Sequence, residues 1–188
     1  LLDVPRERYV PDALQVAAYA EENLPLGEGR VILQARTFAK ILDFLAIGPD
    51  DLVLDVGAGL GYSTAVLARL AEAVVALEED PAMAKDAEAT LATEGVDSAV
   101  VIEATLAEGA PKHGPYDVIV VEGAVETVPE QIESQLKDSG RIAAIFAEGA
   151  LGVVKIGHKI DGRINWRYAF NAGAPVLPGF AAERAFML

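Results

Sequence analysis

Three glycines spaced by single residues follow a short apolar run, and this pattern constrains the fold most. The run 53–56 reads Val-Leu-Asp-Val and leads directly into Gly57, Gly59 and Gly61. A short buried strand that stops at glycines and precedes a helical pattern, here 62–71, is typical of parallel α/β proteins. Glycine lets the backbone turn sharply and lets a ligand approach without a Cβ in the way. We therefore expect this loop to form part of a ligand site.

The rest of the chain alternates between apolar runs and helical patterns. Strands are predicted over 52–56, 74–77, 99–102, 116–121 and 140–146, and helices over 12–23, 37–45, 62–71, 81–93 and 129–137. This alternation predicts a Rossmann-like α/β fold, a doubly wound and mainly parallel sheet. The runs 152–160 and 164–171 flank Asp161-Gly162, which predicts an antiparallel hairpin at the end of the sheet.

One domain is expected over 1–188. It divides into an N-terminal helical cap (1–50), a cofactor-binding core (51–150) and antiparallel C-terminal strands (151–188). The net charge of −14 disfavours a nucleic-acid partner, because phosphate backbones repel an acidic chain. The sequence shows no signal peptide and no apolar run long enough to cross a membrane, and it contains no cysteine. We expect a cytoplasmic protein.

The glycine spacing separates two classes of cofactor. A dinucleotide-binding loop reads G-x-G-x-x-G and would need glycine where this chain has Tyr62. Glycines at 57, 59 and 61 match instead the tighter loop of enzymes that bind S-adenosylmethionine. Glu78 ends the next predicted strand, about 20 residues beyond the loop, where a carboxylate accepts hydrogen bonds from both ribose hydroxyls. Together these features predict a site for S-adenosylmethionine.

Two further residues flank this loop. Asp55 precedes it, and its carboxylate is expected either to orient the loop and the amino-acid end of the cofactor or to cap local N–H groups. Tyr62 begins the following helix and is expected to lie beside the cofactor or to pack the helix start. The two histidines have no carboxylate at ligand spacing, so no metal site is predicted.

Five segments match the motifs of one known family. They are VPRERYVP (4–11), AYAEENLPLGEGRVILQ (18–34), VLDVGAGLGYSTAVLA (53–68), GPYDVIVVEGAVETVPEQIESQLKDSGRI (114–142) and FNAGAPVLPGF (170–180). Through these segments the chain resembles the protein-L-isoaspartate O-methyltransferases over nearly its whole length. The resemblance implies methyl transfer from S-adenosylmethionine to the α-carboxylate of an isoaspartyl residue in a damaged protein or peptide, with S-adenosylhomocysteine as the product.

The chemistry implied by this resemblance places few demands on acid–base groups. A carboxylate acceptor is already ionised at neutral pH, so positioning and desolvation should dominate over general-base catalysis. The family counterpart of Gln34 lies in the substrate pocket, which implies the same place for Gln34.

Three positions depart from the family pattern. Leu33 stands where the family has a serine at the substrate carboxylate, and a leucine side chain cannot donate a hydrogen bond. Thr105 replaces an aspartate that accepts from the adenine amino group, which leaves its hydroxyl as the expected contact. Glu122 begins a Glu-Gly-Ala stretch where the family has Thr-Ala-Ala.

These departures leave three functions open. The first is an isoaspartyl carboxyl methyltransferase. The second is a methyltransferase acting on a small-molecule acceptor. The third is a non-enzymatic relative that works through protein contacts. The sequence predicts no oligomeric state.

Overall fold

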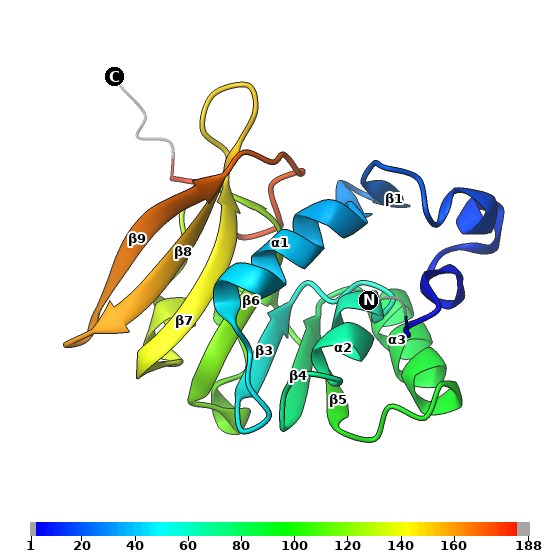
Figure 1. The fold of residues 1–188 in the computed structure, drawn as a ribbon, viewed down its shortest axis with the longest axis horizontal. Helices are drawn as coiled ribbons and strands as arrows, with labels where there is room; N and C mark the ends of the chain where they lie inside the picture. The colour runs from blue at the N-terminus through cyan, green and yellow to red at the C-terminus, as the bar shows by residue number, and fades with distance from the viewer. Residues whose placement is uncertain (1–2, 184–188) are drawn as a thin grey trace.

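A seven-stranded sheet forms the centre of the computed structural model, which describes residues 3–183. Its strands are β3 (Leu52–Val56), β4 (Ala73–Glu78), β5 (Ala99–Glu103), β6 (Tyr116–Val125), β7 (Leu136–Phe146), β8 (Val153–Ile160) and β9 (Arg163–Phe170). They lie in the order β5-β4-β3-β6-β7-β8-β9 (Figure 1). Strands β3 to β7 are parallel, and β8 and β9 are antiparallel. The predicted mainly parallel sheet with a terminal hairpin is confirmed.

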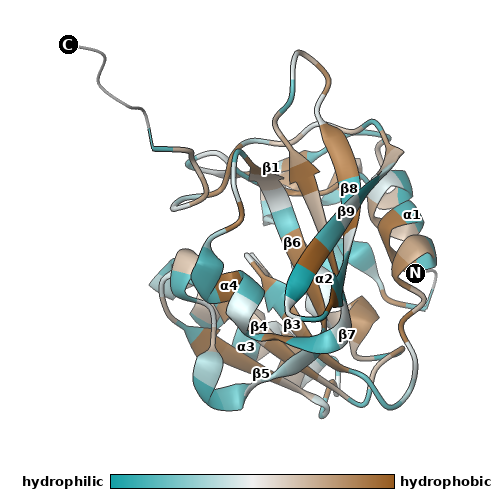
Figure 2. Cartoon of the chain, turned by 90° about the vertical axis from the view of Figure 1, so that its left-hand side faces the viewer, coloured by the Kyte–Doolittle hydropathy of each residue, from teal (hydrophilic) through white to brown (hydrophobic). Residues whose placement is uncertain are grey.

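Both faces of the parallel strands are covered. On one face, α1 (Ala35–Leu45) and α2 (Tyr62–Leu67) pack on alternate strand residues such as Val53 and Val118. On the other, α4 (Glu130–Ser134) and the 3₁₀ helices η3 (Leu106–Glu108) and η4 (Pro111–His113) lie over residues such as Leu54 and Ile119. Figure 2 shows hydrophobic residues along the inner strands, whereas β9 has bands of both colours. The apolar runs of the sequence follow from this double burial.

The predicted helix bounds agree with the structure to different degrees. Helix α3 spans Pro81–Thr93 as predicted, and the Asp80 side chain caps it by accepting from the amides of Ala82 and Met83. Helix α1 starts at Ala35, slightly before its predicted start. Helices α2 and α4 end earlier than predicted, and β7 begins directly after α4.

The N-terminal segment differs most from expectation. The predicted helix over 12–23 is only the 3₁₀ helix η2 (Asp12–Ala17), in which Val16 is fully exposed. It follows η1 (Arg6–Tyr9) and precedes a hairpin of β1 (Leu24–Gly27) and β2 (Arg30–Ile32) that was not predicted. The apolar residues of 12–23 are mostly alanines, which contribute too little burial to stabilise an amphipathic helix.

The sequence boundaries extend past the described residues. Residues 1–2 of the expected cap and 184–188 of the expected C-terminal strands lie outside the range 3–183. Within that range, no helix combines the length and apolar character that crossing a membrane requires. The division into cap, core and C-terminal strands stays a prediction.

Candidate functional site

The carboxyl edge of the parallel strands places a glutamate on either side of the glycine loop. Val56, at the end of β3, pairs with Leu77 of β4 and with Val121 of β6. The next residue on each neighbouring strand is a glutamate, Glu78 on one side and Glu122 on the other. Since ligands of open α/β sheets bind outside this edge, the loop and both glutamates define the candidate site.

The loop has the sharp course that its spacing predicts. Gly57, Gly59 and Gly61 have φ angles of 82°, 58° and 92°, in the left-handed region that favours glycine. The amides of Gly57 and Ala58 donate to the carbonyl oxygen of Leu77 at 2.9 and 3.1 Å, which attaches the loop to the end of β4.

Side chains from two distant segments cover this loop. A Cβ on Gly59 would come within 2.8 Å of Leu26 in β1. A Cβ on Gly57 would come within 3.1 Å of the Arg30 Nη2 atom and 3.4 Å of Leu177. The space that the glycines leave open is therefore partly filled by the chain itself.

Segment 175–180 brings Leu177 to this place. The amide of Ala124 in β6 donates to the carbonyl oxygen of Pro175 at 2.8 Å, and the amide of Leu177 donates to that of Ala124 at 2.9 Å. Phe180, fully buried, fixes the end of the segment in the core. The segment thus continues along the strand that bears Glu122.

Glu78 is completely buried and accepts five hydrogen bonds. The Arg30 guanidinium donates from Nη1 to Oε1 at 2.8 Å and from Nη2 to Oε2 at 2.7 Å. The amide of Gly59 donates to Oε2 at 2.7 Å, and those of Glu79 and Asp80 donate to Oε1 at 2.9 and 3.0 Å. A carboxylate offers about four acceptor positions, so its capacity is used up.

Asp55 is buried beneath the loop. Its Oδ2 atom accepts from the hydroxyls of Ser63 and Thr64 at 2.7 and 2.6 Å, whereas Oδ1 has no partner among the described residues. Burial raises the pKa of Asp55 to about 6, and the two hydroxyl donors oppose this shift. Asp55 therefore holds the start of α2 and keeps one buried oxygen without a partner among the described residues.

Glu122 is buried with an unpartnered Oε1 atom, again among the described residues. Burial raises its pKa well above the ordinary value, and the nearby charge of Asp55 adds to this, while Arg6 and Arg30 oppose it. Glu122 lines a small cavity of about 10 Å³ next to the loop, together with Leu26, Val31, Ile32, Gly57, Ala58, Tyr62 and Ser63.

Two buried arginines complete the cluster, and neither is among the site residues predicted from the sequence. Arg6 in η1 donates from Nη2 to the carbonyl oxygen of Leu33 at 2.9 Å and lies 4.6 Å from the ring centroid of Tyr62. Arg30 reaches Glu78 from 48 residues away in the sequence. Each arginine lies in an N-terminal segment that matches a family motif, which was the one available signal.

The remaining predicted site residues fall into two groups. Tyr62 is buried against Tyr9 and Phe38 and also lines the small cavity. Thr105 lines an open pocket of about 410 Å³ beside Glu78, with Glu28, Arg30, Glu79, Asp80, Pro81, Met83 and Pro178. Within residues 3–183, no group of three or more acidic or histidine side chains is arranged to hold a metal ion.

Leu33 and Gln34 do not join this cluster. The Leu33 side chain is buried in the core, and the small cavity is lined by Val31 and Ile32 from the same stretch. The Gln34 side chain turns outward and donates to the carbonyl oxygen of Glu21 at 2.8 Å. Their predicted role at an acceptor stays a prediction.

These residues fit S-adenosylmethionine with one exception. The glycine loop offers a cradle that a Cβ would fill, Glu78 stands at the strand end, and the open pocket beside Thr105 offers room for a flat base. Arg30 is the exception, because it takes the acceptor positions that a ribose would use.

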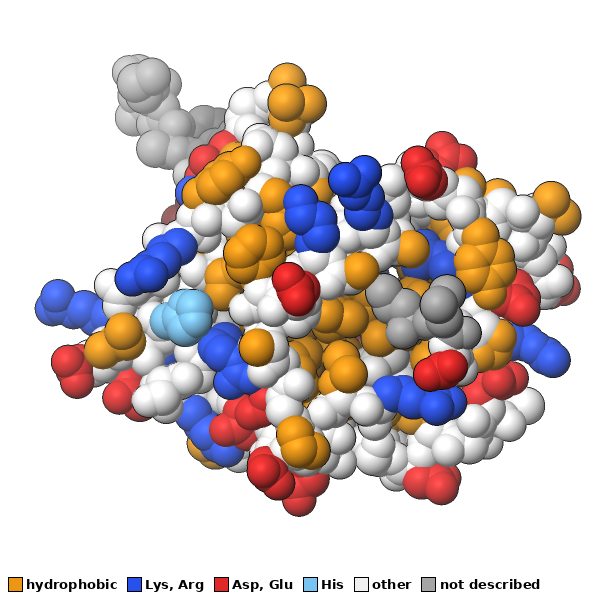
Figure 3. Space-filling view, viewed as in Figure 1, with side chains coloured by type: hydrophobic (Ala, Val, Ile, Leu, Met, Phe, Trp, Pro, Cys, Tyr) orange, Lys and Arg blue, Asp and Glu red, His pale blue; other side chains and the backbone are white. Residues whose placement is uncertain are grey.

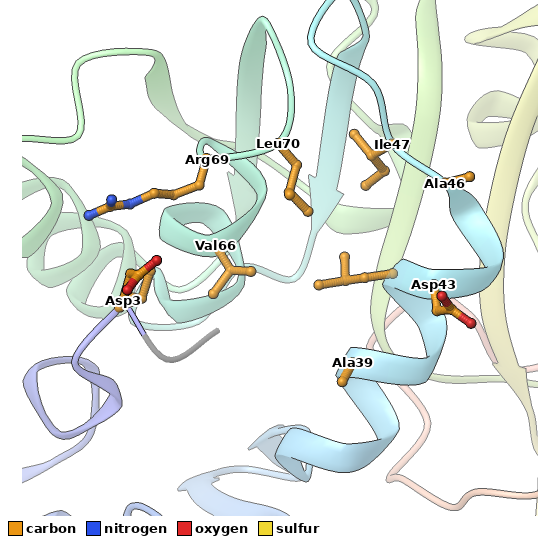
Figure 4. Close-up of a pocket in the computed structure, with 10 residues that line it drawn as sticks. Asp3, Ala39, Asp43, Ala46, Ile47, Val66, Arg69 and Leu70 are labelled. Atoms are coloured by element: carbon orange, nitrogen blue, oxygen red, sulfur yellow. The ribbon is translucent and has the colours of Figure 1, made fainter.

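A larger cavity lies away from this cluster, between α1 and α2. It measures about 630 Å³ and is lined mainly by apolar side chains such as Ile47, Val66 and Leu70 (Figure 4). Figure 3 shows hydrophobic side chains gathered in the hollow on this face. It lacks the converging carboxylates of the strand edge, so it is not the candidate site.

Comparisons with known proteins agree with the geometry. The family model described as "Protein-L-isoaspartate(D-aspartate) O-methyltransferase (PCMT)" matches residues 1–169. A protein-L-isoaspartate O-methyltransferase of Methylorubrum extorquens is 44% identical over 139 residues, 74% of this chain and 60% of the relative. One from Methanoregula boonei is 39% identical over 76% of this chain and 65% of the relative. The chain thus spans less than two thirds of these relatives.

Solved structures show the same fold. A protein-L-isoaspartate O-methyltransferase superposes with a TM-score of 0.82 at 24% identity, covering 95% of this chain and 59% of the other. A putative Plasmodium falciparum relative, in complex with S-adenosyl-L-homocysteine, superposes with a TM-score of 0.79 at 20% identity, covering 94% and 87%.

Proposed function

Because this chain belongs to the protein-L-isoaspartate O-methyltransferase family, we propose that it is an S-adenosylmethionine-dependent carboxyl O-methyltransferase. The family match over residues 1–169 is the observation that supports this most strongly. The glycine loop and Glu78 at the carboxyl edge of the sheet supply a matching site. We also propose that it acts in the cytoplasm, and a chain without cysteine, which forms no disulfide, is compatible with that reducing compartment.

Each site residue has a part in this proposal. The backbone at Gly57, Gly59 and Gly61 allows close approach of the cofactor, and Glu78 accepts from the ribose hydroxyls. Thr105 lines the pocket for the adenine, and Asp55 faces the amino-acid end. When bound, S-adenosylmethionine supplies an electrophilic methyl group.

The acceptor in this proposal is the carboxylate of an isoaspartyl residue in a protein or peptide. This group is ionised at neutral pH and needs no general base. The surrounding chain must therefore orient it and exclude water. Apolar side chains of Leu26, Val31 and Ile32 beside the loop are suited to excluding water.

The direct test uses cofactor with a labelled methyl group and two matched peptides. One peptide contains an isoaspartyl residue and the other has an ordinary aspartyl residue at the same position. We expect label on the isoaspartyl peptide alone, with its release by mild base as the mark of an ester. A folded protein that labels neither peptide would reject isoaspartyl transfer.

A second candidate function is methyl transfer to a small-molecule acceptor. The observation that favours it is that apolar side chains, those of Leu26, Val31 and Ile32, lie beside the loop. Labelled small-molecule product without peptide labelling would support this function. If S-adenosylhomocysteine does not bind at all, the third alternative applies, a non-enzymatic relative.

A further inference from the structure

Arg30 occupies the carboxylate on which the proposed cofactor depends. Its guanidinium forms a bidentate ion pair with the Glu78 carboxylate, and both side chains are buried. Such pairs are among the strongest polar contacts in proteins because both bonds are charge-assisted and share one fixed geometry. Arg30 therefore competes with any other donor for Glu78.

The competition is direct because Glu78 has no spare acceptor position. Three of its five donors are backbone amides of Gly59, Glu79 and Asp80, which belong to the loop and to the turn after β4. These amides cannot leave without unfolding their turns. The two guanidinium bonds are the ones that a pair of ribose hydroxyls could replace.

The hairpin that bears Arg30 has an exposed tip and a base that is anchored in the core. Strands β1 and β2 form a separate two-stranded sheet, anchored at its base by buried Leu24 and Ile32. At the tip, Gly27, Glu28 and Gly29 all have positive φ and are exposed. The tip therefore lacks the core contacts that fix the base.

A displaced guanidinium would still have acidic neighbours. The open pocket beside Glu78 is lined by Arg30 itself and by the carboxylates of Glu28, Glu79 and Asp80. Movement into this pocket would keep the positive charge beside negative groups, which limits the cost of breaking a buried ion pair.

We propose that Arg30 is a specificity-determining residue of the cofactor site. Its guanidinium occupies the acceptor positions on Glu78 that the ribose hydroxyls of a bound cofactor would use. Cofactor binds only when this guanidinium leaves Glu78. The inference rests on the proposed function, since it assumes that the ligand of this site contains a ribose.

The test is calorimetric binding of S-adenosylhomocysteine to the wild type and to two variants. Arg30→Gln removes the charge and the two-bond pairing, and Arg30→Lys keeps the charge but makes a single contact, so at least one variant should fold. We expect at least about tenfold tighter binding for Arg30→Gln, because the wild-type affinity is scaled by the fraction of molecules in which Glu78 is free, here about one tenth or less. Arg30→Lys should lie between this variant and the wild type.

Arg141→Lys is the matched control. Arg141 pairs with Asp51 at 2.6 Å and donates to the carbonyl oxygen of Leu45 at 2.7 Å, at the opposite edge of the sheet. This variant should bind S-adenosylhomocysteine as the wild type does. If this control gains as much affinity for S-adenosylhomocysteine as the Arg30 variants do, the gain comes from a general destabilisation of the fold, and the inference is overturned.

A second ligand pair reports on the ribose itself. Arg30→Gln should tighten the binding of adenosine more than that of its dideoxy analogue, because only adenosine has the two ribose hydroxyls that must displace the guanidinium from Glu78. In Arg30→Gln, adenosine should bind more tightly than the analogue. Equal binding of both ligands to this variant would overturn the inference.

The outcomes separate this inference from the proposed function. Tight binding to the wild type with no gain in either Arg30 variant overturns the inference and leaves the function standing. Weaker binding in both variants means that Arg30 contacts the ligand, which also overturns it. Binding to no protein, wild type or variant, overturns both.

Discussion

Glu78 and Glu122 occupy equivalent places on the two strands that flank β3, yet their surroundings are opposite. Each follows a residue that pairs with Val56, and each is buried. Glu78 accepts five hydrogen bonds, whereas Glu122 has an oxygen with no partner among the described residues. Burial raises the pKa of Glu122 well above its ordinary value.

The difference lies in where the donors come from. The turn after β4 aims the amides of Glu79 and Asp80 at Glu78, and Gly59 and Arg30 donate the other three hydrogen bonds. The strand after Glu122 continues to Val125 and offers no such turn. Glu78 is therefore held by three backbone amides and one distant arginine, whereas Arg6 and Arg30 act on Glu122 through their charges.

The largest effect should come from Glu78→Gln. This change leaves the buried Arg30 guanidinium without its counter-charge, and breaking one partner of such a pair costs about 3–5 kcal/mol. We expect a corresponding loss in the free energy of unfolding, measured by chemical denaturation. Glu88→Gln, on the exposed face of α3, is the control and should change stability little. A loss below about 1 kcal/mol would show that Glu78 and Arg30 are not paired in solution.

Glu122→Gln should stabilise the folded protein near neutral pH, whereas Glu78→Gln should destabilise it. The ordinary pKa of a glutamate is 4.5, and the pKa of Glu122 in the folded chain lies well above it. Between these two pKa values the folded chain keeps the Glu122 proton and the unfolded chain loses it. The free energy of unfolding therefore falls as pH rises from the ordinary pKa to the folded-state pKa. Removing the titration should raise the free energy of unfolding near neutral pH by at least about 1 kcal/mol. The gain should vanish when denaturation is repeated below the ordinary pKa. A gain in the free energy of unfolding that does not depend on pH would contradict a raised pKa of Glu122.

The smallest effect concerns Asp55, which lies between the two glutamates. Its charge contributes to the raised pKa of Glu122. In a double-mutant cycle, the gain from Glu122→Gln should therefore shrink by about 0.5 kcal/mol or more when Asp55→Asn is already present. If the stability changes of the two single variants add exactly in the double variant, the carboxyl groups of Asp55 and Glu122 do not interact, and the prediction is wrong.

Local patterns predicted the elements that depend on neighbours in sequence. Asp80 and Pro81 define the start of α3, and Asp161-Gly162 defines the turn between β8 and β9. The three glycines predicted the loop because their positive φ angles are a property of single residues. Glu78 could be placed at the site because it follows the next strand.

The partners of the buried carboxyl groups could not be predicted in this way. Arg30 and Glu78 are 48 residues apart, and their contact depends on a hairpin whose strands, of four and three residues, are too short to show an alternating pattern. The periodic alanines of 12–23 suggested a helix, but Val16 points into solvent. Periodicity indicates a possible apolar face, whereas tertiary packing decides whether anything covers it.

Strand β9 is the outer strand at one end of the sheet, and this affects how molecules meet one another. An outer strand presents backbone groups to which another chain can add, the usual start of aggregation. Here, exposed Arg163 and Arg167 lie on that strand, and the register shift at Val154–Lys155 disturbs the ladder beside it. Charge and irregular pairing are features that disfavour the addition of another chain at this edge.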